Sequence, residues 1–261
     1  MSELAFRGVR VAYGRGRAAR FAVDGVDLTV RSGTTHGLVG ESGSGKSTLA
    51  RAAVGMARVA DGTITLDGTD LTRRTPVRRR VQMVFQDPLA ALDPRMPVGA
   101  SVAEGLLATG KRLSRADREE RVRGLFHRVH VDPGRAGELP ASFSGGQRQR
   151  ITIARALAAE PAVLIADEIT SALDVSVQGV VLNLLRELKE ELALTMLFIS
   201  HNLAVVRYVS DEVSVMRAGR IVEQGPTGTV LADPADEYTR ELLRSVPLLG
   251  QALDLEPSDA G

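Results

Sequence analysis

The 261-residue chain contains no cysteine and no tryptophan, and its aromatic residues are three tyrosines and six phenylalanines. Without cysteine the protein forms no disulfide, offers no thiolate nucleophile and has no cysteine-ligated zinc or iron–sulfur centre. These absences exclude thiol catalysis and argue against redox chemistry.

Long apolar runs are missing as well. No segment approaches the roughly 20 continuous apolar residues that span a bilayer, and residues 1–12 lack the apolar block of a secretory signal. Apolar residues still make up 44% of the chain and charged residues 25%, the balance of a folded globular domain. We therefore expect the chain itself to stay in the cytosol.

An excess of charge of either sign is also absent. Thirty-three basic and 32 acidic residues leave a formal net charge of +1, which gives no electrostatic reason to expect nucleic acid as a partner. Five arginines fall within residues 73–80, a run more typical of a solvated surface than of a binding site. Lysine occurs only three times, so the setting of each lysine is informative.

The hydrophobic pattern predicts a β-rich N-terminal part, a helical middle part and a C-terminal part in which strands and helices alternate. Apolar segments between glycine turns predict four strands, at residues 6–13, 21–30, 35–39 and 63–66. Helical spacing follows over residues 97–140. The strands and helices then predicted are a strand at 162–166, a helix at 175–192, a strand at 195–199, a hairpin at 212–225 and short helices at 226–243. Alternation of buried strand and helix predicts a parallel sheet.

A glycine-rich segment lies between the predicted strand 35–39 and a helix predicted at 49–56. Its glycines let the backbone amides converge on phosphate oxygens, at the positive end of the following helix. Lys46 is placed to reach the β and γ phosphates, and the Ser47 hydroxyl to complete the coordination of Mg²⁺. The predicted phosphate loop consists of Gly40, Glu41, Ser42, Gly43, Ser44, Gly45, Lys46, Ser47 and Thr48.

The predicted strand 162–166 ends in two adjacent carboxylates, Asp167 and Glu168. Parallel sheets present ligand-facing groups at the carboxyl ends of their strands. Asp167 suits Mg²⁺, a hard ion that prefers oxygen ligands. Glu168 is then the candidate general base, or the residue that orients water for attack on the γ phosphate.

Residues 143–150 (FSGGQRQR) open a helix shortly before the acidic strand. The residues at its start, Ser144, Gly145, Gly146 and Gln147, form a second candidate anion site. This octapeptide resembles the signature of the ATP-binding cassette (ABC) ATPases, and its place between the phosphate loop and the acidic strand is the order that this family uses. If the octapeptide only capped a helix after a turn, its position between the phosphate loop and the acidic strand would have no explanation.

The resemblance covers nearly the whole chain and implies roles for further residues. Tyr13 matches the aromatic residue that stacks on adenine, and Gln86 the glutamine that contacts Mg²⁺ or water and joins the core to the helical insertion. Asp174, in Ser171-Ala172-Leu173-Asp174, matches a loop at the dimer seam. His201 matches the histidine that contacts the γ phosphate. ATP and Mg²⁺ are the implied cofactors.

The family resemblance also implies a fold. It is an α/β P-loop NTPase core with a mainly parallel sheet, an N-terminal antiparallel β subdomain and an α-helical insertion. We expect one ABC ATPase domain over residues 1–247, with a helical subdomain at about 88–160, and a flexible tail at 248–261. Two cassettes are expected to pack head to tail, each ATP held between Lys46 of one and residues 144–147 of the other.

Three parts of the sequence look like the oligopeptide, dipeptide and nickel importer branch of this family. They are residues 86–95 (QDPLAALDPR), Phe143 and residues 233–247. That branch implies two membrane permeases, an indirectly coupled extracytoplasmic binding protein and a peripheral position at the cytoplasmic face of the membrane. The chain departs from the family at Ile169, where proline is usual, and at Asp236-Glu237, where the branch has histidine-proline. A nickel or other small-solute importer, a non-transport ABC ATPase and a regulatory nucleotide binder remain as alternatives, and the second cassette is either an identical or a related chain.

Overall fold

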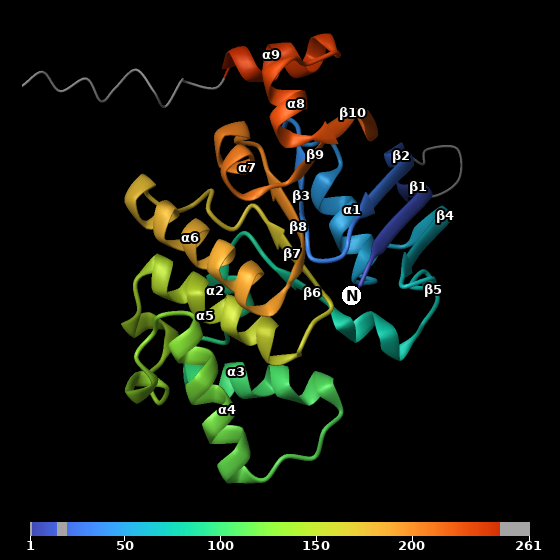
Figure 1. Cartoon of the computed structure of the whole chain (residues 1–261). Coiled ribbons are helices and arrows are strands. Elements are labelled where there is room, and N and C mark those ends of the chain that lie inside the picture. Colours follow the sequence, from blue (N-terminus) through green and yellow to red (C-terminus); the bar gives the residue numbers. More distant parts are fainter. Residues whose placement is uncertain (1, 15–19, 246–261) are drawn as a thin grey trace, which may run out of the picture.

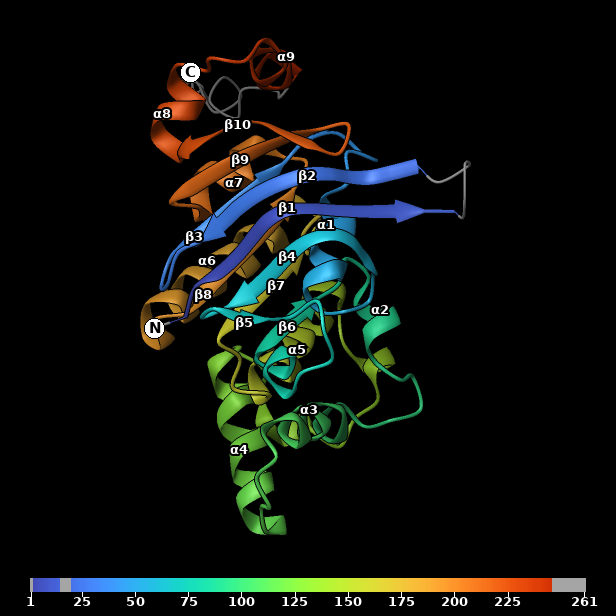
Figure 2. The same ribbon diagram turned by 90° about the vertical axis from the view of Figure 1, so that its right-hand side faces the viewer.

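The computed structural model describes residues 2–14 and 20–245. An antiparallel sheet of four strands in the order β2-β1-β4-β5 lies beside a larger sheet (Figures 1 and 2). The strands of this smaller sheet are β1 (Leu4–Tyr13), β2 (Arg20–Val30), β4 (Val59–Leu66) and β5 (Thr69–Asp70). The register pairs Phe6 with Leu28 on one side and with Ile64 on the other, so one apolar face runs across the sheet.

The larger sheet has six strands in the order β10-β9-β3-β8-β7-β6. Its strands are β3 (Thr35–Val39), β6 (Val81–Val84), β7 (Val163–Asp167), β8 (Thr195–Ser200), β9 (Glu212–Arg217) and β10 (Arg220–Pro226). The first five pair in parallel, and β10 turns back antiparallel on β9. Strands β3, β7 and β8 are buried along their whole length, as expected for parallel strands that are covered on both faces of the sheet.

Two apolar cores cover the two faces of the larger sheet. Ile165 and Leu197 belong to the core between this sheet, helix α1 (Lys46–Ala53) and the antiparallel sheet. Leu164 and Phe198, one residue along each strand, belong to the core on the opposite face. Figure 1 shows α6 and α7 on that opposite face. The remaining helices of this part are α6 (Val175–Leu192), α7 (Leu203–Val209), α8 (Thr227–Ala232) and α9 (Glu237–Ser245).

The chain between β6 and β7 forms a helical insertion. Its helices are α2 (Pro88–Ala91), α3 (Val98–Leu106), α4 (Arg115–Arg128) and α5 (Gly145–Ala158). Capping boxes start α4 at Ser114 and α5 at Ser144. The hydroxyl of each serine accepts the N–H of the third helical residue, and the serine N–H donates to the side chain of that residue. In both views α3 and α4 lie at the opposite end of the molecule from α8 and α9 (Figures 1 and 2).

The predicted fold class is confirmed. The strand predicted at 35–39 and the helix predicted at 175–192 have the observed bounds, and the hairpin at 212–225 forms around Ala218-Gly219. The pattern missed β6 and α7, it began β4 four residues late, and it began α1 at Leu49 where the helix starts at Lys46. Within residues 2–14 and 20–245, no helix is long and apolar enough to cross a bilayer. The predicted tail at 248–261, and residues 246–247 of the branch pattern, lie outside the described residues.

The arginine run at residues 73–80 is only partly a solvated surface. Arg78 is half-buried and donates hydrogen bonds to the carbonyl oxygens of Leu71 and Arg73. A Cβ on Gly55 would lie 2.4 Å from the Arg78 guanidinium, so this glycine makes room for it. Arg78 therefore closes a loop of the protein's own backbone.

Candidate functional site

The phosphate loop connects β3 to α1, and its shape requires glycine at two positions. Gly40 and Gly45 have φ values of 151° and 109°. A Cβ on Gly40 would lie 2.1 Å from the Met216 carbonyl oxygen, and one on Gly45 would lie 2.2 Å from that of Ala22. Any side chain at these positions would collide with backbone, so the loop keeps the tight curvature that turns amides toward one centre.

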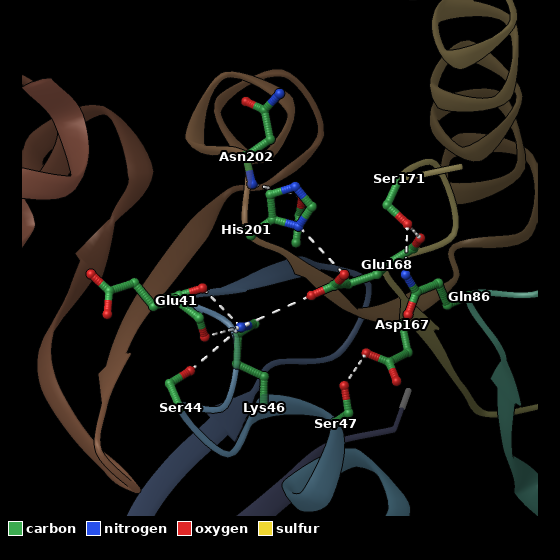
Figure 3. Close-up of polar contacts among 12 residues, drawn as sticks. Glu41, Ser44, Lys46, Ser47, Gln86, Asp167, Glu168, Ser171, His201 and Asn202 are labelled. Atoms are coloured by element: carbon green, nitrogen blue, oxygen red, sulfur yellow. Dashed lines mark hydrogen bonds and ion pairs between the residues drawn. The ribbon is translucent and has the colours of Figure 1, made fainter. Parts of the chain in front are cut away.

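Lys46 points its ammonium group back into this loop. The side chain is only 4% exposed. Its Nζ donates to the carbonyl oxygens of Gly40 and Glu41, each at 2.8 Å, and to Ser44 Oγ at 3.4 Å (Figure 3). Burial lowers the pKa of Lys46, and the nearby carboxylates of Glu168, Asp167 and Glu41 oppose that shift. A compact cation is thus held where a phosphate group would approach.

Ser47 and Asp167 meet across the gap between the loop and β7. The Ser47 hydroxyl donates to Asp167 Oδ1 at 2.8 Å. Burial raises the pKa of Asp167, while this hydrogen bond acts in the opposite direction. A hydroxyl and a carboxylate are hard oxygen donors of the kind that Mg²⁺ takes, and this ion usually keeps several waters beside one or two protein ligands. The pair therefore fits Mg²⁺, and the described residues contain no cluster of three or more His, Cys, Asp and Glu side chains suited to a metal.

Glu168 lies between Lys46 and His201. Its Oε1 is 4.0 Å from Lys46 Nζ, and its Oε2 is 3.4 Å from His201 Nδ1 (Figure 3). The residue has a left-handed backbone with φ of 49°, which is uncommon for glutamate, and its N–H donates to the Ile199 carbonyl oxygen of the neighbouring strand at 2.9 Å. The backbone after β7 is thus fixed so that the carboxylate faces the phosphate loop.

Ile169, the departure from the family pattern, points away from this cluster. Its side chain is 1% exposed and belongs to the apolar core that also contains Phe198. The position keeps its N–H, which proline would lack. Apolar burial stabilises the chain here by the usual hydrophobic effect.

Gln86 follows β6 and is linked to Glu168 through Ser171. Its Nε2 donates to Ser171 Oγ at 3.1 Å, and the Ser171 hydroxyl donates to the Glu168 carbonyl oxygen at 2.8 Å (Figure 3). Gln86, in the segment that leads from β6 into the helical insertion, therefore connects directly to the loop that carries Glu168. Sequence reasoning assigned Ser171 only to the dimer seam and missed this bridge, since the pairing of β6 with β7 that produces it was not predicted.

Tyr13 and Asp174 lie at the edges of the site. Tyr13 ends β1, is 51% exposed, and its hydroxyl is 3.3 Å from Thr48 Oγ1. An exposed ring beside the phosphate loop is available for stacking. Asp174 caps α6 by accepting the Val177 N–H at 2.9 Å and the Ser176 hydroxyl.

The FSGGQ segment is not part of the hydrogen-bonded cluster around Lys46. Ser144 and Gln147 instead cap α5 by bonding to each other's main chain. Ser144 is exposed and Gly145 is partly exposed, whereas Gly146 is buried. A Cβ on Gly146 would lie 2.2 Å from Val177 Cγ1, so there is no room for a side chain at this position. This arrangement leaves the start of α5 open to an approaching molecule. The other predicted residues of the loop, Ser42 and Gly43, are exposed at its tip.

Comparisons with known proteins show the family to which this chain belongs. The family model described as "ABC transporter" matches residues 23–171. Oligopeptide transport ATP-binding protein OppF of Escherichia coli is 47% identical over 232 residues, which cover 87% of this chain and 70% of that protein. Oligopeptide transport ATP-binding protein OppD of Mycobacterium tuberculosis is 48% identical over 231 residues, or 87% of this chain and 37% of its own.

Solved structures of the same architecture are also similar. A dimeric ATP-binding cassette in a post-hydrolysis state, bound to ADP and Pi, matches with a TM-score of 0.77 and 26% identity, over 86% of this chain and 98% of that one. The cbiO1 protein of Clostridium perfringens, part of an ABC transporter complex, matches with a TM-score of 0.78 and 28% identity, over 88% of this chain and 90% of its own. The resemblance first seen in residues 143–150 is thereby confirmed: the chain belongs to the ABC transporter family, among its ATP-binding subunits.

Proposed function

We propose that this chain is the Mg²⁺-dependent ATP-hydrolysing subunit of an ABC importer whose cargo is peptides. The observation that carries the proposal is the position of Glu168, with one carboxylate oxygen 4.0 Å from the buried Lys46 ammonium and the other 3.4 Å from His201. A carboxylate held beside a phosphate-binding lysine is the arrangement that phosphoryl transfer to water needs.

The nucleotide is held by groups of distinct chemistry. Adenine stacks on the exposed Tyr13 ring, and the phosphates accept hydrogen bonds from the amides of residues 40–48. Lys46 turns its ammonium from the loop carbonyls to the β and γ phosphates. Ser47 and Asp167 hold Mg²⁺, with Gln86 nearby, and this ion supplies charge neutralisation at the phosphates when bound.

Glu168 orients the attacking water and accepts its proton. The water oxygen forms a bond to the γ phosphorus as the bond to the bridging oxygen of ADP breaks, and inorganic phosphate leaves. His201 donates to the γ phosphate and faces Glu168 from the opposite side to Lys46. The link from Gln86 through Ser171 connects this centre to the helical insertion, residues 88–160 of a domain that spans 1–247.

The active unit is a head-to-tail dimer of cassettes. Ser144, Gly145, Gly146 and Gln147 of one subunit contact the ATP bound at Lys46 of the other, and Asp174 lies at the seam. Two observations support this: Ser144 is exposed at the helix start, and similar solved structures are dimers. Two membrane permeases, and indirectly an extracytoplasmic binding protein, complete the importer, which places this chain at the cytoplasmic face of the membrane.

Peptides are favoured over nickel or another small solute by relatives that are 47–48% identical and are called oligopeptide transport proteins.

The test has two parts. Purified protein is assayed for phosphate release from ATP with and without Mg²⁺, and the tagged chain is isolated from detergent-solubilised membranes. Mg²⁺-dependent hydrolysis and co-isolated permeases are expected. Absence of hydrolysis, or partners found only among ribosomes or DNA, would contradict the proposal. Uptake of labelled peptide and of nickel by cells that lack the chain then separates the two cargo classes.

A further inference from the structure

The last described helix, α9, contacts the phosphate loop through one buried hydroxyl. Tyr238 is 2% exposed, and its hydroxyl oxygen accepts the N–H of Glu41 at 3.0 Å, across 197 residues of sequence. The Arg217 guanidinium lies over its ring, 4.7 Å from the centroid. The phenol is therefore fixed on one side by a cation and on the other by the main chain of the loop.

Glu41 is held from two directions. Its N–H is bonded to Tyr238, and its carbonyl oxygen accepts Lys46 Nζ at 2.8 Å. Gly40, the residue before it, packs against the Met216 carbonyl, next in sequence to the Arg217 that covers the Tyr238 ring. One residue of the loop thus joins the C-terminal helix to the phosphate-binding lysine.

We propose that Tyr238 is a positioning residue of the nucleotide site, which sets the second residue of the phosphate loop and, through it, the orientation of Lys46. This inference rests on the proposed function, because it assigns a further residue to the same ATP site. A part-buried N–H without an acceptor is costly, so loss of the hydroxyl leaves the loop free to turn this amide toward water.

Burial raises the pKa of Tyr238, so the phenol stays neutral through the physiological range and offers the same acceptor throughout. The ring has a separate role. Tyr238 belongs to the apolar core, against which Leu242 and Leu243 of α9 also pack. Anchoring of α9 therefore depends on the ring, whereas positioning of the loop depends on the hydroxyl alone.

The substitution Tyr238→Phe separates these roles because it keeps the ring and removes the acceptor. Tyr208 is the control because it has the same two kinds of contact: its hydroxyl donates to Asn183, and Arg186 lies over its ring at 4.8 Å. It lies half-exposed on α7. For Tyr238→Phe we expect the Kd of MgATP, measured by calorimetry, to rise about fivefold, which corresponds to the loss of one neutral hydrogen bond. The Glu41 amide should exchange with deuterium faster, while kcat and melting temperature change little. Tyr208→Phe should alter neither the Kd nor the Glu41 exchange.

Several results would overturn the inference. Unchanged Kd and Glu41 exchange in Tyr238→Phe would show that the hydroxyl does not hold the loop. An equal rise in Kd for both variants would attribute the effect to general loss of packing. If the wild-type protein binds no ATP, the proposed function fails, and exchange at the Glu41 amide still decides whether Tyr238 fixes the loop.

Discussion

The Asp167 carboxylate accepts a 2.8 Å hydrogen bond from the Ser47 hydroxyl, which comes from a helix 120 residues earlier in the chain. Two oxygen donors of different chemistry, the proposed ligands of Mg²⁺, are thereby set side by side. Pre-arranged ligands lower the cost of binding, so the affinity for Mg²⁺ should depend sharply on this pair.

Asp167→Asn tests the pair directly. The amide oxygen still accepts from Ser47, but the charge that attracts Mg²⁺ is lost. Loss of an outer-shell partner alone typically costs about 10–100-fold in metal affinity, so removal of a ligand should raise the half-maximal Mg²⁺ concentration for ATP hydrolysis at least about tenfold. Asp132→Asn, at an exposed turn where the oxygen caps Gly134, is the control and should leave the Mg²⁺ titration unchanged. An unchanged titration for Asp167→Asn would exclude the aspartate as a ligand.

Although Asp167→Asn should weaken Mg²⁺ binding, it should make the folded protein more stable to unfolding when Mg²⁺ is absent. Burial raises the pKa of Asp167 above its ordinary value of 3.8. A carboxyl with a raised folded pKa contributes stability that is fully present below its unfolded pKa and is lost as pH rises through the folded pKa. Asparagine does not ionise, so the variant loses no stability in this way as the pH rises. In Mg²⁺-free buffer we expect Asp167→Asn to unfold at higher urea than wild type at pH 7.5, with the difference shrinking as pH falls toward 4. A less stable variant at pH 7.5 would disprove this.

Glu168→Gln should stop turnover without preventing ATP binding. The amide keeps the shape of the side chain but accepts no proton, and general-base catalysis is worth about 10²–10⁴-fold in rate. We expect phosphate release to fall at least about 100-fold and a dimer held by ATP to appear in size-exclusion chromatography. Glu190→Gln, on the exposed face of α6, should behave as wild type. Retained wild-type hydrolysis would remove Glu168 from the catalytic role.

Tyr13→Ala tests the adenine contact. Base stacking on an aromatic ring contributes roughly 1–3 kcal/mol, so the KM for ATP should rise about fivefold or more while kcat changes little. Tyr13→Phe keeps the ring and loses only the 3.3 Å contact with Thr48, so its KM should stay within about twofold of wild type. Equal effects of both substitutions would place the role in the hydroxyl instead.

Gly146→Ala tests why the FSGGQ segment needs a second glycine. The added Cβ would lie 2.2 Å from Val177 Cγ1, and overpacking of this kind costs about 1–3 kcal/mol. Urea denaturation should show that loss, and Val177→Ala in the same protein should restore most of it. Gly124→Ala, in the open middle of α4, serves as the control, and its stability should not fall. Failure of Val177→Ala to restore stability would show that the contact is not the cause.

Much of this site was visible in the sequence because the chemistry depends on short contiguous segments. Gly40 to Thr48 and Asp167-Glu168 follow buried strands, and the carboxyl ends of parallel strands meet at the same edge of a sheet. The bridge from Gln86 to Ser171 was hidden, because β6 is only four residues long and no apolar run marks it. Tyr238 was noticed only as part of the branch pattern. Its bond to Glu41 depends on where α9 docks, which side-chain periodicity does not encode.

The topology gives the helical insertion an unusual kind of attachment. It leaves the edge strand β6 and re-enters at β7, the next strand in the sheet, so both anchors stand next to each other. Because both chain connections lie at one edge of the sheet, the length and shape of the insertion have no effect on the spacing of the inner strands. The same edge is where Gln86 meets Ser171, so any displacement of the insertion would reach the main chain of Glu168 through two hydrogen bonds.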